Sequence, residues 1–284
     1  MILDSRNSEA LTRIIAEKGW ENVASISFSK ATLTGLVELA RLTKLGGPEA
    51  LEPAKNCLRN LPGAVNWFNN IRGLFDGNFA PTNSSGKIYS APKAEVWLIT
   101  SSTCIETDSF LLFLQRFERS LRNSGFKNRF PKLISQGLLE IADNIARHSS
   151  VSGLPINGVL GYHVEQEKMN YVAADLGRGV LASLQENSKW ASLQDESEAL
   201  IAAARDGATR IKAHDSGDGF RQIFQSFVDR EGTLLMRSGR GLAEIRGNAT
   251  SKIAETGYSK ALEGLRVTAA CDLRKKSEEI LLCC

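Results

Sequence analysis

Three polar side chains recur at every fourth position in the segment LLEIADNIARHSS, residues 138–150. They are Glu140, Asn144 and His148, and because an α-helix turns 100° per residue they would form one stripe along its side. The apolar residues of the segment centre on a direction roughly 90° away, which puts the stripe at the edge of the buried face. Such a stripe can line a site where an Asn oxygen binds Mg²⁺ and a Glu orients or deprotonates a water.

Two glycine motifs follow along the chain. The first, Asp175-x-Gly177-x-Gly179, comes directly after a strand-like run, where the Asp can accept a hydrogen bond from an exocyclic amine such as that of adenine. Its glycines would let the backbone approach a ligand closely. The second, Gly217-x-Gly219, comes directly before an amphipathic segment, and a helix beginning there would offer free N–H groups to a phosphate. Each motif alone is common in turns, so the prediction of a nucleotide site depends on their order and setting.

The polar stripe and the two glycine motifs resemble, in this order, the N box, the G1 box and the G2 box of the GHKL ATPase superfamily. That family includes gyrase, the heat-shock chaperone, histidine kinases and MutL. The resemblance covers the larger part of the chain, from about Glu95 to its end. Because the family binds ATP in the Bergerat fold, the resemblance implies an ATP-binding domain with ATP and Mg²⁺ as its cofactors.

The resemblance also implies a role for single residues. Asn144 would coordinate Mg²⁺ beside the nucleotide, Glu140 would place the water for hydrolysis, and Asp175 would read the adenine amine. The glycines of both motifs would wrap the nucleotide. His148, one turn beyond the pair, is interpreted as support for the helix end rather than as a catalytic group.

Two further groups of residues raise the question of phosphate contacts. Residues 181–216 would form the ATP lid, and Thr209 with the Arg after it resembles a short signal of some small bacterial members of the family. A phosphate contact from this pair and a plain polar lid are equally good interpretations. Arg237, Arg240 and Arg246 come later, and a solvated face is favoured for them over a phosphate clamp.

Two positions depart from the family pattern. The residue after the N-box Asn is often Ala in the family, whereas it is Ile145 here. A Thr that supports the adenine-reading Asp usually follows the Gly of the last strand, whereas Leu265 follows Gly264 here. The nearest Thr is Thr268, so the details of the adenine contact are open at this point.

The segments around the motifs predict an α/β fold, a two-layer sandwich of Bergerat type with a mixed, mostly antiparallel sheet and helices on one face. The expected strands are 95–100, 158–164, 170–175, 233–237 and 265–272. The expected helices are 109–124, 130–149, 198–205 and 220–228. The polar tetrapeptide EQEK would close a hairpin between the second and third strands.

The N-terminal part is expected to be a smaller α/β region, residues 1–92, followed by the ATP-binding domain, residues 93–284. The boundary is placed in 76–93, which is rich in turn formers. A strand at 23–30 and a helix at 33–45 resemble the start of a STAS-like module, as in anti-sigma-factor antagonists. The alternative is an α/β extension that packs on the ATPase.

Bulk composition excludes several classes of protein. The 284 residues have a net charge of +3 with interspersed signs, which gives no case for binding nucleic acid. The sequence contains no signal peptide and no run of 18 apolar residues, so no contact with a membrane is expected. The five cysteines lack metal-ligand spacing, and their odd number is compatible with a reducing cytoplasm.

The resemblance implies three functions that the residues do not separate. The first is an ATP-dependent conformational switch with slow hydrolysis in a bacterial regulatory or defence system, signalling through a co-encoded protein partner or a homodimer. The second is a protein serine kinase of the anti-sigma type. The third is a nucleotide-dependent protein-binding module without turnover. A histidine kinase is disfavoured, because no dimerisation helix carries a candidate phosphoacceptor His.

Overall fold

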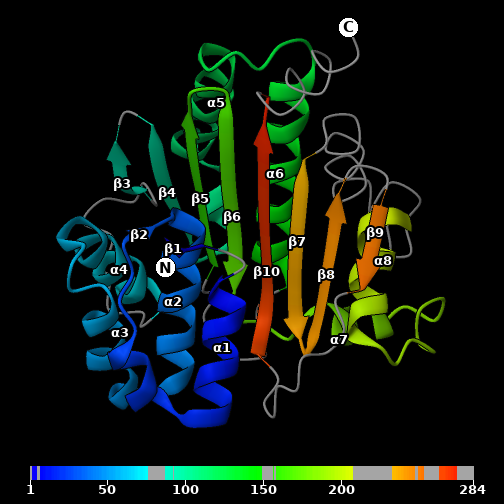
Figure 1. Cartoon of the computed structure of the whole chain (residues 1–284). Coiled ribbons are helices and arrows are strands. Elements are labelled where there is room, and N and C mark those ends of the chain that lie inside the picture. Colours follow the sequence, from blue (N-terminus) through cyan, green and yellow to red (C-terminus); the bar gives the residue numbers. More distant parts are fainter. Residues whose placement is uncertain are drawn as a thin grey trace, which may run out of the picture.

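An eight-stranded antiparallel sheet forms the centre of the protein (Figure 1). The computed structural model describes residues 2–4, 7–75, 87–91, 93–148, 156, 158–206, 232–246, 249–252 and 262–273. The strand order in space is β3-β4-β5-β6-β10-β7-β8-β9. The strands are β3 (Lys87–Ala91), β4 (Ala94–Ile99), β5 (Gly158–Glu165), β6 (Lys168–Asp175), β7 (Thr233–Gly239), β8 (Gly241–Arg246), β9 (Ala249–Lys252) and β10 (Leu262–Asp272). The predicted α/β class is confirmed.

The predicted hairpin at the centre of this sheet is confirmed. β5 and β6 pair in continuous register from Gly158 opposite Asp175 to Glu165 opposite Lys168. The two turn residues have positive φ angles, 45° at Gln166 and 64° at Glu167. Two consecutive residues with positive φ match the twist of the flanking strands, which is why short hairpins favour such turns.

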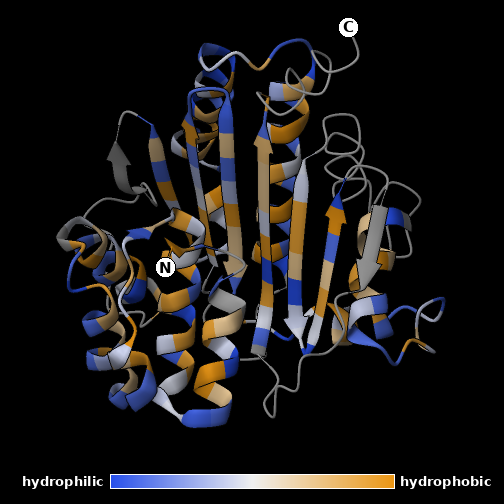
Figure 2. Ribbon diagram, in the orientation of Figure 1, coloured by the Kyte–Doolittle hydropathy of each residue, from blue (hydrophilic) through white to orange (hydrophobic). Residues whose placement is uncertain are grey.

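One face of the sheet is covered by the predicted helices α5 (Asp108–Asn123) and α6 (Phe130–His148), and by α8 (Glu196–Asp206). Their apolar residues share one core with the strands, and Figure 2 shows the strands as largely hydrophobic. Aromatic rings of α5 stack on the sheet, with the centroid of Phe117 lying 4.7 Å from that of Tyr162. This face agrees with the sandwich expected from the sequence.

The opposite face is covered in part, because the N-terminal helices pack on β4, β5 and β6 (Figure 1). These helices are α1 (Asn7–Lys18), α2 (Leu33–Gly46), α3 (Leu51–Cys57) and α4 (Pro62–Phe75). They share a second core with Val96, Leu98, Val159, Val172 and Ala174 of the sheet. The prediction of helices on one face only is therefore wrong, because β4 to β6 are apolar at both odd and even positions and bury both faces.

The N-terminal region differs in detail from the prediction. The helix at 33–45 is confirmed as α2, whose N-cap Thr32 accepts a hydrogen bond from the backbone N–H of Gly35 at 3.2 Å. The strand predicted at 23–30 is wrong, since Trp20–Ser25 forms the 3₁₀ helix η1 and the short strand β2 (Lys30–Ala31) begins only at the end of the predicted range. Its partner is the two-residue strand β1 (Ile2–Leu3), which offers too short an edge for a longer strand. The helices of this region pack on the sheet, and the STAS-like module and the extension both stay predictions.

Three strands of the sheet were absent from the sequence prediction: β3, β8 and β9. Of these, β3 pairs with β4, so the sheet begins before the boundary placed at residue 92. Residues 76–86, the rest of the predicted boundary, lie outside the described residues. Among the helices that the structure describes, none is both long and apolar enough to cross a membrane.

Candidate functional site

The polar stripe of α6 lies where the periodicity predicts it. Ile141 and Ile145 are buried in the core, while Glu140 is exposed and Asn144 is partly exposed. The backbone of His148 ends the helix, and its side chain is outside the described residues. Glu140 and Asn144 therefore stand at the edge of the buried face, where their polar groups can reach a ligand.

The C-terminal half of α6 lies against the end of β5 and β6. A Cβ atom added to Gly158 would be 2.4 Å from Cγ2 of Ile145, so this helix residue fills the space that the glycine leaves. Gly158 in turn is the residue paired with Asp175. Directly paired residues of antiparallel strands have Cα atoms about 5 Å apart. The N-box helix and the first glycine motif thus meet at one end of the sheet.

The side chain of Asp175 points to the α6 face. Tyr171 and Ala173 on the same strand belong to the core beneath α5 and α6, whereas Val172 and Ala174 belong to the N-terminal core. Because side chains alternate along a strand, Asp175 continues the first series. It therefore lies on the same face, and at the same end of the sheet, as Asn144.

Asp175 is held in a nearly closed environment. Its side chain is 5% exposed, and Oδ1 accepts a hydrogen bond of 2.6 Å from the backbone N–H of Gly177. Burial raises the pKa of Asp175 to about 6, although the bond from Gly177, the charge of Arg41 and a backbone hydrogen bond of Leu265 act in the opposite direction. At neutral pH the carboxylate is mostly ionised and can accept a hydrogen bond from an amine.

Gly179 has a conformational reason to be glycine. It precedes α7 (Val180–Gln185) with a φ of 84°, a left-handed conformation that disfavours other residues. The next residue, Val180, donates its backbone N–H to Oγ of Ser238 on β7 at 2.9 Å. A Cβ at position 179 would lie 2.8 Å from the same oxygen. Gly179 therefore lets the chain lie close against β7 at the start of α7.

The last strand completes the surroundings of Asp175. Gly264 has a φ of 81°, and a Cβ there would be only 2.0 Å from the carbonyl oxygen of Asp175. Leu265 stands where the family usually has Thr, and its backbone hydrogen-bonds to Asp175 in place of a hydroxyl. The carboxylate is thus supported without that Thr.

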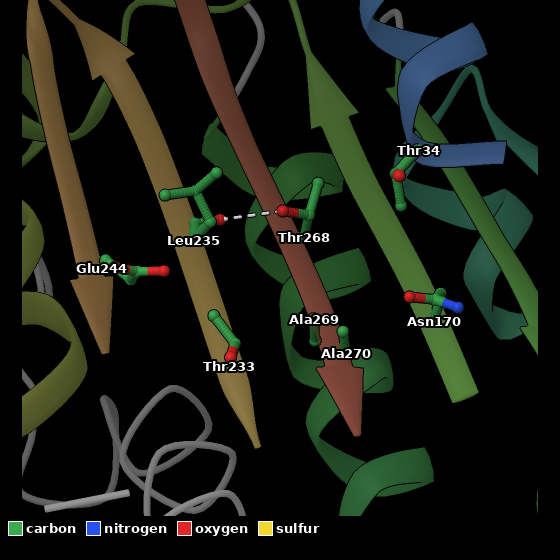
Figure 3. Close-up of a pocket in the computed structure, with 8 residues that line it drawn as sticks. All are labelled: Thr34, Asn170, Thr233, Leu235, Glu244, Thr268, Ala269 and Ala270. Carbon is green, nitrogen blue, oxygen red and sulfur yellow. Dashed lines mark hydrogen bonds between the residues drawn. The ribbon is translucent and has the colours of Figure 1, made fainter. Parts of the chain in front are cut away.

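The side chain of Thr268 lies on the opposite face of the sheet from that of Asp175. Its hydroxyl donates to the carbonyl of Leu235 at 3.4 Å, and it lines a shallow hollow with Thr34 and Asn170 (Figure 3). Thr34 belongs to α2, so this hollow lies on the side of the N-terminal helices. Thr268 is therefore not a substitute for the missing Thr beside Asp175.

The described part of the predicted lid includes a core helix. Leu200 and Ala204 of α8 are buried in the same core as α6, because the alanine-rich side of the helix packs closely on the sheet. At the start of α8, Glu196 accepts a hydrogen bond of 2.5 Å from the backbone of Arg240 in the β7–β8 turn. Residues 196–206 are thus a fixed part of the fold, which narrows the segment able to act as a lid.

Three predicted nucleotide contacts cannot be placed. Thr209, Gly217 and Gly219 lie in 207–231, outside the described residues, and they stay predictions. Arg237, in contrast, is described and fully buried, so its assignment to a solvated face is wrong. A signal for its burial was present, because this Arg interrupts the otherwise apolar strand TLLMRSG, where a charge needs a buried partner.

The donor set at α6 fits a Mg²⁺ shared with a nucleotide. The described residues contain no group of three or more His, Cys, Asp or Glu side chains able to hold a metal ion. Mg²⁺ commonly takes only one or two protein oxygens and completes its shell with water and phosphate. Asn144 can supply one such oxygen from its partly exposed position on α6.

Comparison with known proteins adds no relative. No protein-family model matches the chain, and no curated protein matches it. The GHKL resemblance is therefore without support from overall sequence similarity. It depends on the residues of the N box and the first glycine motif, which the fold brings to one end of the sheet.

Proposed function

We propose that this protein binds Mg·ATP at the end of the sheet where α6 meets β5 and β6, in a domain of Bergerat type. Slow hydrolysis of the nucleotide would drive a conformational switch in a bacterial regulatory or defence system. The proposal is supported above all by one observation, the chain of contacts from Ile145 through Gly158 to Asp175. Two motifs 31 positions apart in sequence, Asn144 and Asp175, meet on one face through these contacts.

Each described residue has a task that its surroundings allow. Asp175 accepts a hydrogen bond from the adenine amine, since its carboxylate is buried and held by Gly177. Asn144 offers its side-chain oxygen on the phosphate side, and Glu140 one turn earlier is exposed enough to hold a water. When bound, Mg²⁺ would neutralise phosphate charge.

The burial of Asp175 determines how strongly the site should select nucleotides that carry an amine. A site built to pair a buried carboxylate with an amine discriminates strongly against a ligand that lacks the amine, because the carboxylate is then left unsatisfied. Hydrolysis depends on the exposed Glu140, so turnover is expected to be slow compared with enzymes that enclose the reacting water.

Calorimetric titration of ATP with Mg²⁺ tests the proposal. The wild type should bind, whereas Asn144→Ala should lose the Mg²⁺ dependence and Asp175→Ala should lose binding. Asp143→Ala is the matched control, since this neighbour on α6 only forms an ion pair with Arg147 at 2.7 Å. No binding by the wild type would refute the proposal.

Phosphate release, followed in parallel, separates the alternatives. Release that Glu140→Gln abolishes would establish an ATPase. Binding without release would leave a nucleotide-dependent binding module. Transfer of labelled phosphate from ATP to a co-encoded protein would identify a kinase.

A further inference from the structure

A cluster of buried charges lies on the face of the sheet opposite to Asp175. Glu38 and Arg41 of α2 and Arg266 of β10 are all fully buried. Oε2 of Glu38 accepts a hydrogen bond of 3.0 Å from Nε of Arg41, and Oε1 lies 3.1 Å from Nη1 of Arg266. Arg237, which pairs with Arg266 in the sheet register, adds its charge to the surroundings of Glu38. The cluster joins the N-terminal layer to β10, which lies beside β6, and to β7, which lies beside β10.

The same short segment of β10 also contacts Asp175. The pairing of β10 with β7 is irregular between Leu262 and Leu265, and beyond it Leu265 faces the core beneath α6 while Arg266 faces Glu38. Glu263 receives, on its backbone carbonyl, a hydrogen bond of 2.5 Å from Nη1 of Arg41. Leu265 hydrogen-bonds to Asp175 through its backbone, and Arg266 then returns to Glu38. The contacts of β10 with the charge cluster, at Glu263 and Arg266, thus lie on either side of its contact with Asp175, at Leu265.

The backbone between them leaves little room for independent movement. Gly264 sits so close to Asp175 that even a Cβ atom would come within 2.0 Å of its carbonyl oxygen. Buried ion pairs fix the groups that they join, because separation would leave uncompensated charges in a low-dielectric interior. The contacts of α2 thus reach the same few residues of β10 that support the carboxylate of Asp175.

We propose that Glu38, Arg41 and Arg266 are positioning residues that couple the N-terminal layer to Asp175, so that α2 and the nucleotide control each other through residues 263–266. The coupling rests on the proposed ATP site. It gives the N-terminal layer a role in regulation: a partner that moves α2 changes the affinity for ATP. By reciprocity, ATP changes the stability of α2 on the far face of the sheet.

The chain contains a matched control for this cluster. Glu95 of β4 is also buried, and both its oxygens accept hydrogen bonds from Arg116, at 2.9 Å and 2.7 Å. This second cluster lies on β4, which is separated from β6 by β5. Glu95→Gln removes a buried carboxylate from an Arg, as Glu38→Gln does, but it leaves 263–266 untouched.

The experiment measures ATP affinity and hydrogen exchange together, with Mg²⁺ present. In the wild type, ATP should slow exchange in α2 (Leu33–Gly46) as well as in α6. Glu38→Gln should weaken ATP binding by about 10-fold or more, within the usual range of coupling between sites, and should remove the protection of α2. Glu95→Gln should bind ATP within about 2-fold of the wild type, because it lies outside the coupled segment.

Several outcomes would overturn the coupling. They are ATP binding by the wild type without a change of exchange in α2, an unchanged affinity in Glu38→Gln, or equal losses in both variants. If Glu38→Gln does not fold, Arg41→Lys replaces it, since a lysine keeps the charge but cannot make both guanidinium contacts. Failure of the wild type to bind ATP would instead refute the proposed function itself, which distinguishes the two failures.

Discussion

Among the described residues, a buried glutamate is paired with arginine on each face of the sheet, and the two settings differ. Glu95 faces α5, where its partner Arg116 is 36% exposed and the hydroxyl of Tyr162 donates a further hydrogen bond of 2.9 Å. Glu38 faces β10, and both it and its partners Arg41 and Arg266 have no exposed side-chain surface. Water can replace a lost partner at Arg116, but it cannot do so readily in the second cluster.

The two helical layers are attached to the sheet by different kinds of contact. The α5 side packs through aromatic rings, with Phe117 stacked and Phe113 tilted against Tyr162, and its ion pair lies at the edge of that packing. The N-terminal side places its charges inside the contact with β10. Although burial alone would raise it, the charges of Arg266 and Arg41 lower the pKa of Glu38 to about 2. The second attachment is thus more directional and less tolerant of change.

Loss of Glu38 should have the largest effect on stability. Glu38→Gln leaves buried arginines without their carboxylate, which should lower the free energy of unfolding by about 3–5 kcal/mol. Glu95→Gln should cost less, about 1–2 kcal/mol, because Arg116 can turn to solvent. Urea denaturation of both variants measures the difference, and equal losses would contradict the distinction between the faces.

A side chain at position 264 should cause the next largest loss of stability. Gly264→Ala forces a left-handed residue and a contact of 2.0 Å with the backbone of Asp175, so a loss of about 2–4 kcal/mol is expected. Gly63→Ala is the control, since nothing lies within 4 Å of the added Cβ in α4. That substitution should be neutral or stabilise by up to about 1 kcal/mol. Thermal unfolding checks both, and a neutral Gly264→Ala would refute the close packing.

Removing the charge of Asp175 should raise the free energy of unfolding, whereas the two changes above lower it. Burial raises the pKa of Asp175 from its ordinary value of 3.8 to about 6 in the fold, so the ionised carboxylate destabilises the folded state. The stability that the protonated form of Asp175 provides is fully present below pH 3.8 and is lost as the pH rises through about 6. Asp175→Asn should therefore be more stable than the wild type by about 1–3 kcal/mol at pH 8, and it should bind ATP less tightly.

Melting curves between pH 4 and pH 8 would test that sign. The advantage of Asp175→Asn should grow between about pH 4 and pH 6 and then stay constant. A variant less stable than the wild type at pH 8 would mean that the carboxylate serves the fold rather than a ligand.

The last prediction concerns the contact of α6 with β5. Gly158→Ala places a Cβ 2.4 Å from Cγ2 of Ile145 and should cost about 1–3 kcal/mol. In an Ile145→Ala background the same change should cost less, because the smaller helix residue leaves room. A double-mutant cycle measures the coupling, and additive losses would contradict the contact.

The sequence allowed part of this structure to be predicted. The helical period of α6, the turn between β5 and β6 and the first glycine motif are local patterns, and each is where it was expected. The contact from Ile145 to Gly158 could not be predicted, because the side chain belongs to α6 and the glycine that makes room for it belongs to β5. Helices on both faces had a readable signal, the continuous apolar runs of the central strands.

Other features had no local signal at all. Arg41 meets the backbone of Glu263 across 222 positions, and no spacing within α2 points to that partner. The strand β8 was missed because GLAEIR is short, with a glycine at its start and charged residues among its apolar ones. Long-range charge pairs and short peripheral strands are decided by the assembled fold.

The most direct measurement compares the affinity of the wild type for ATP and for inosine triphosphate, which carries an oxygen in place of the adenine amine. If Asp175 reads that amine, ATP should bind at least about 10-fold more tightly, since the buried carboxylate is left unpaired by the analogue. In Asp175→Asn this preference should disappear. Equal affinities of the wild type for the two nucleotides would contradict the assignment of Asp175, and with it the central claim.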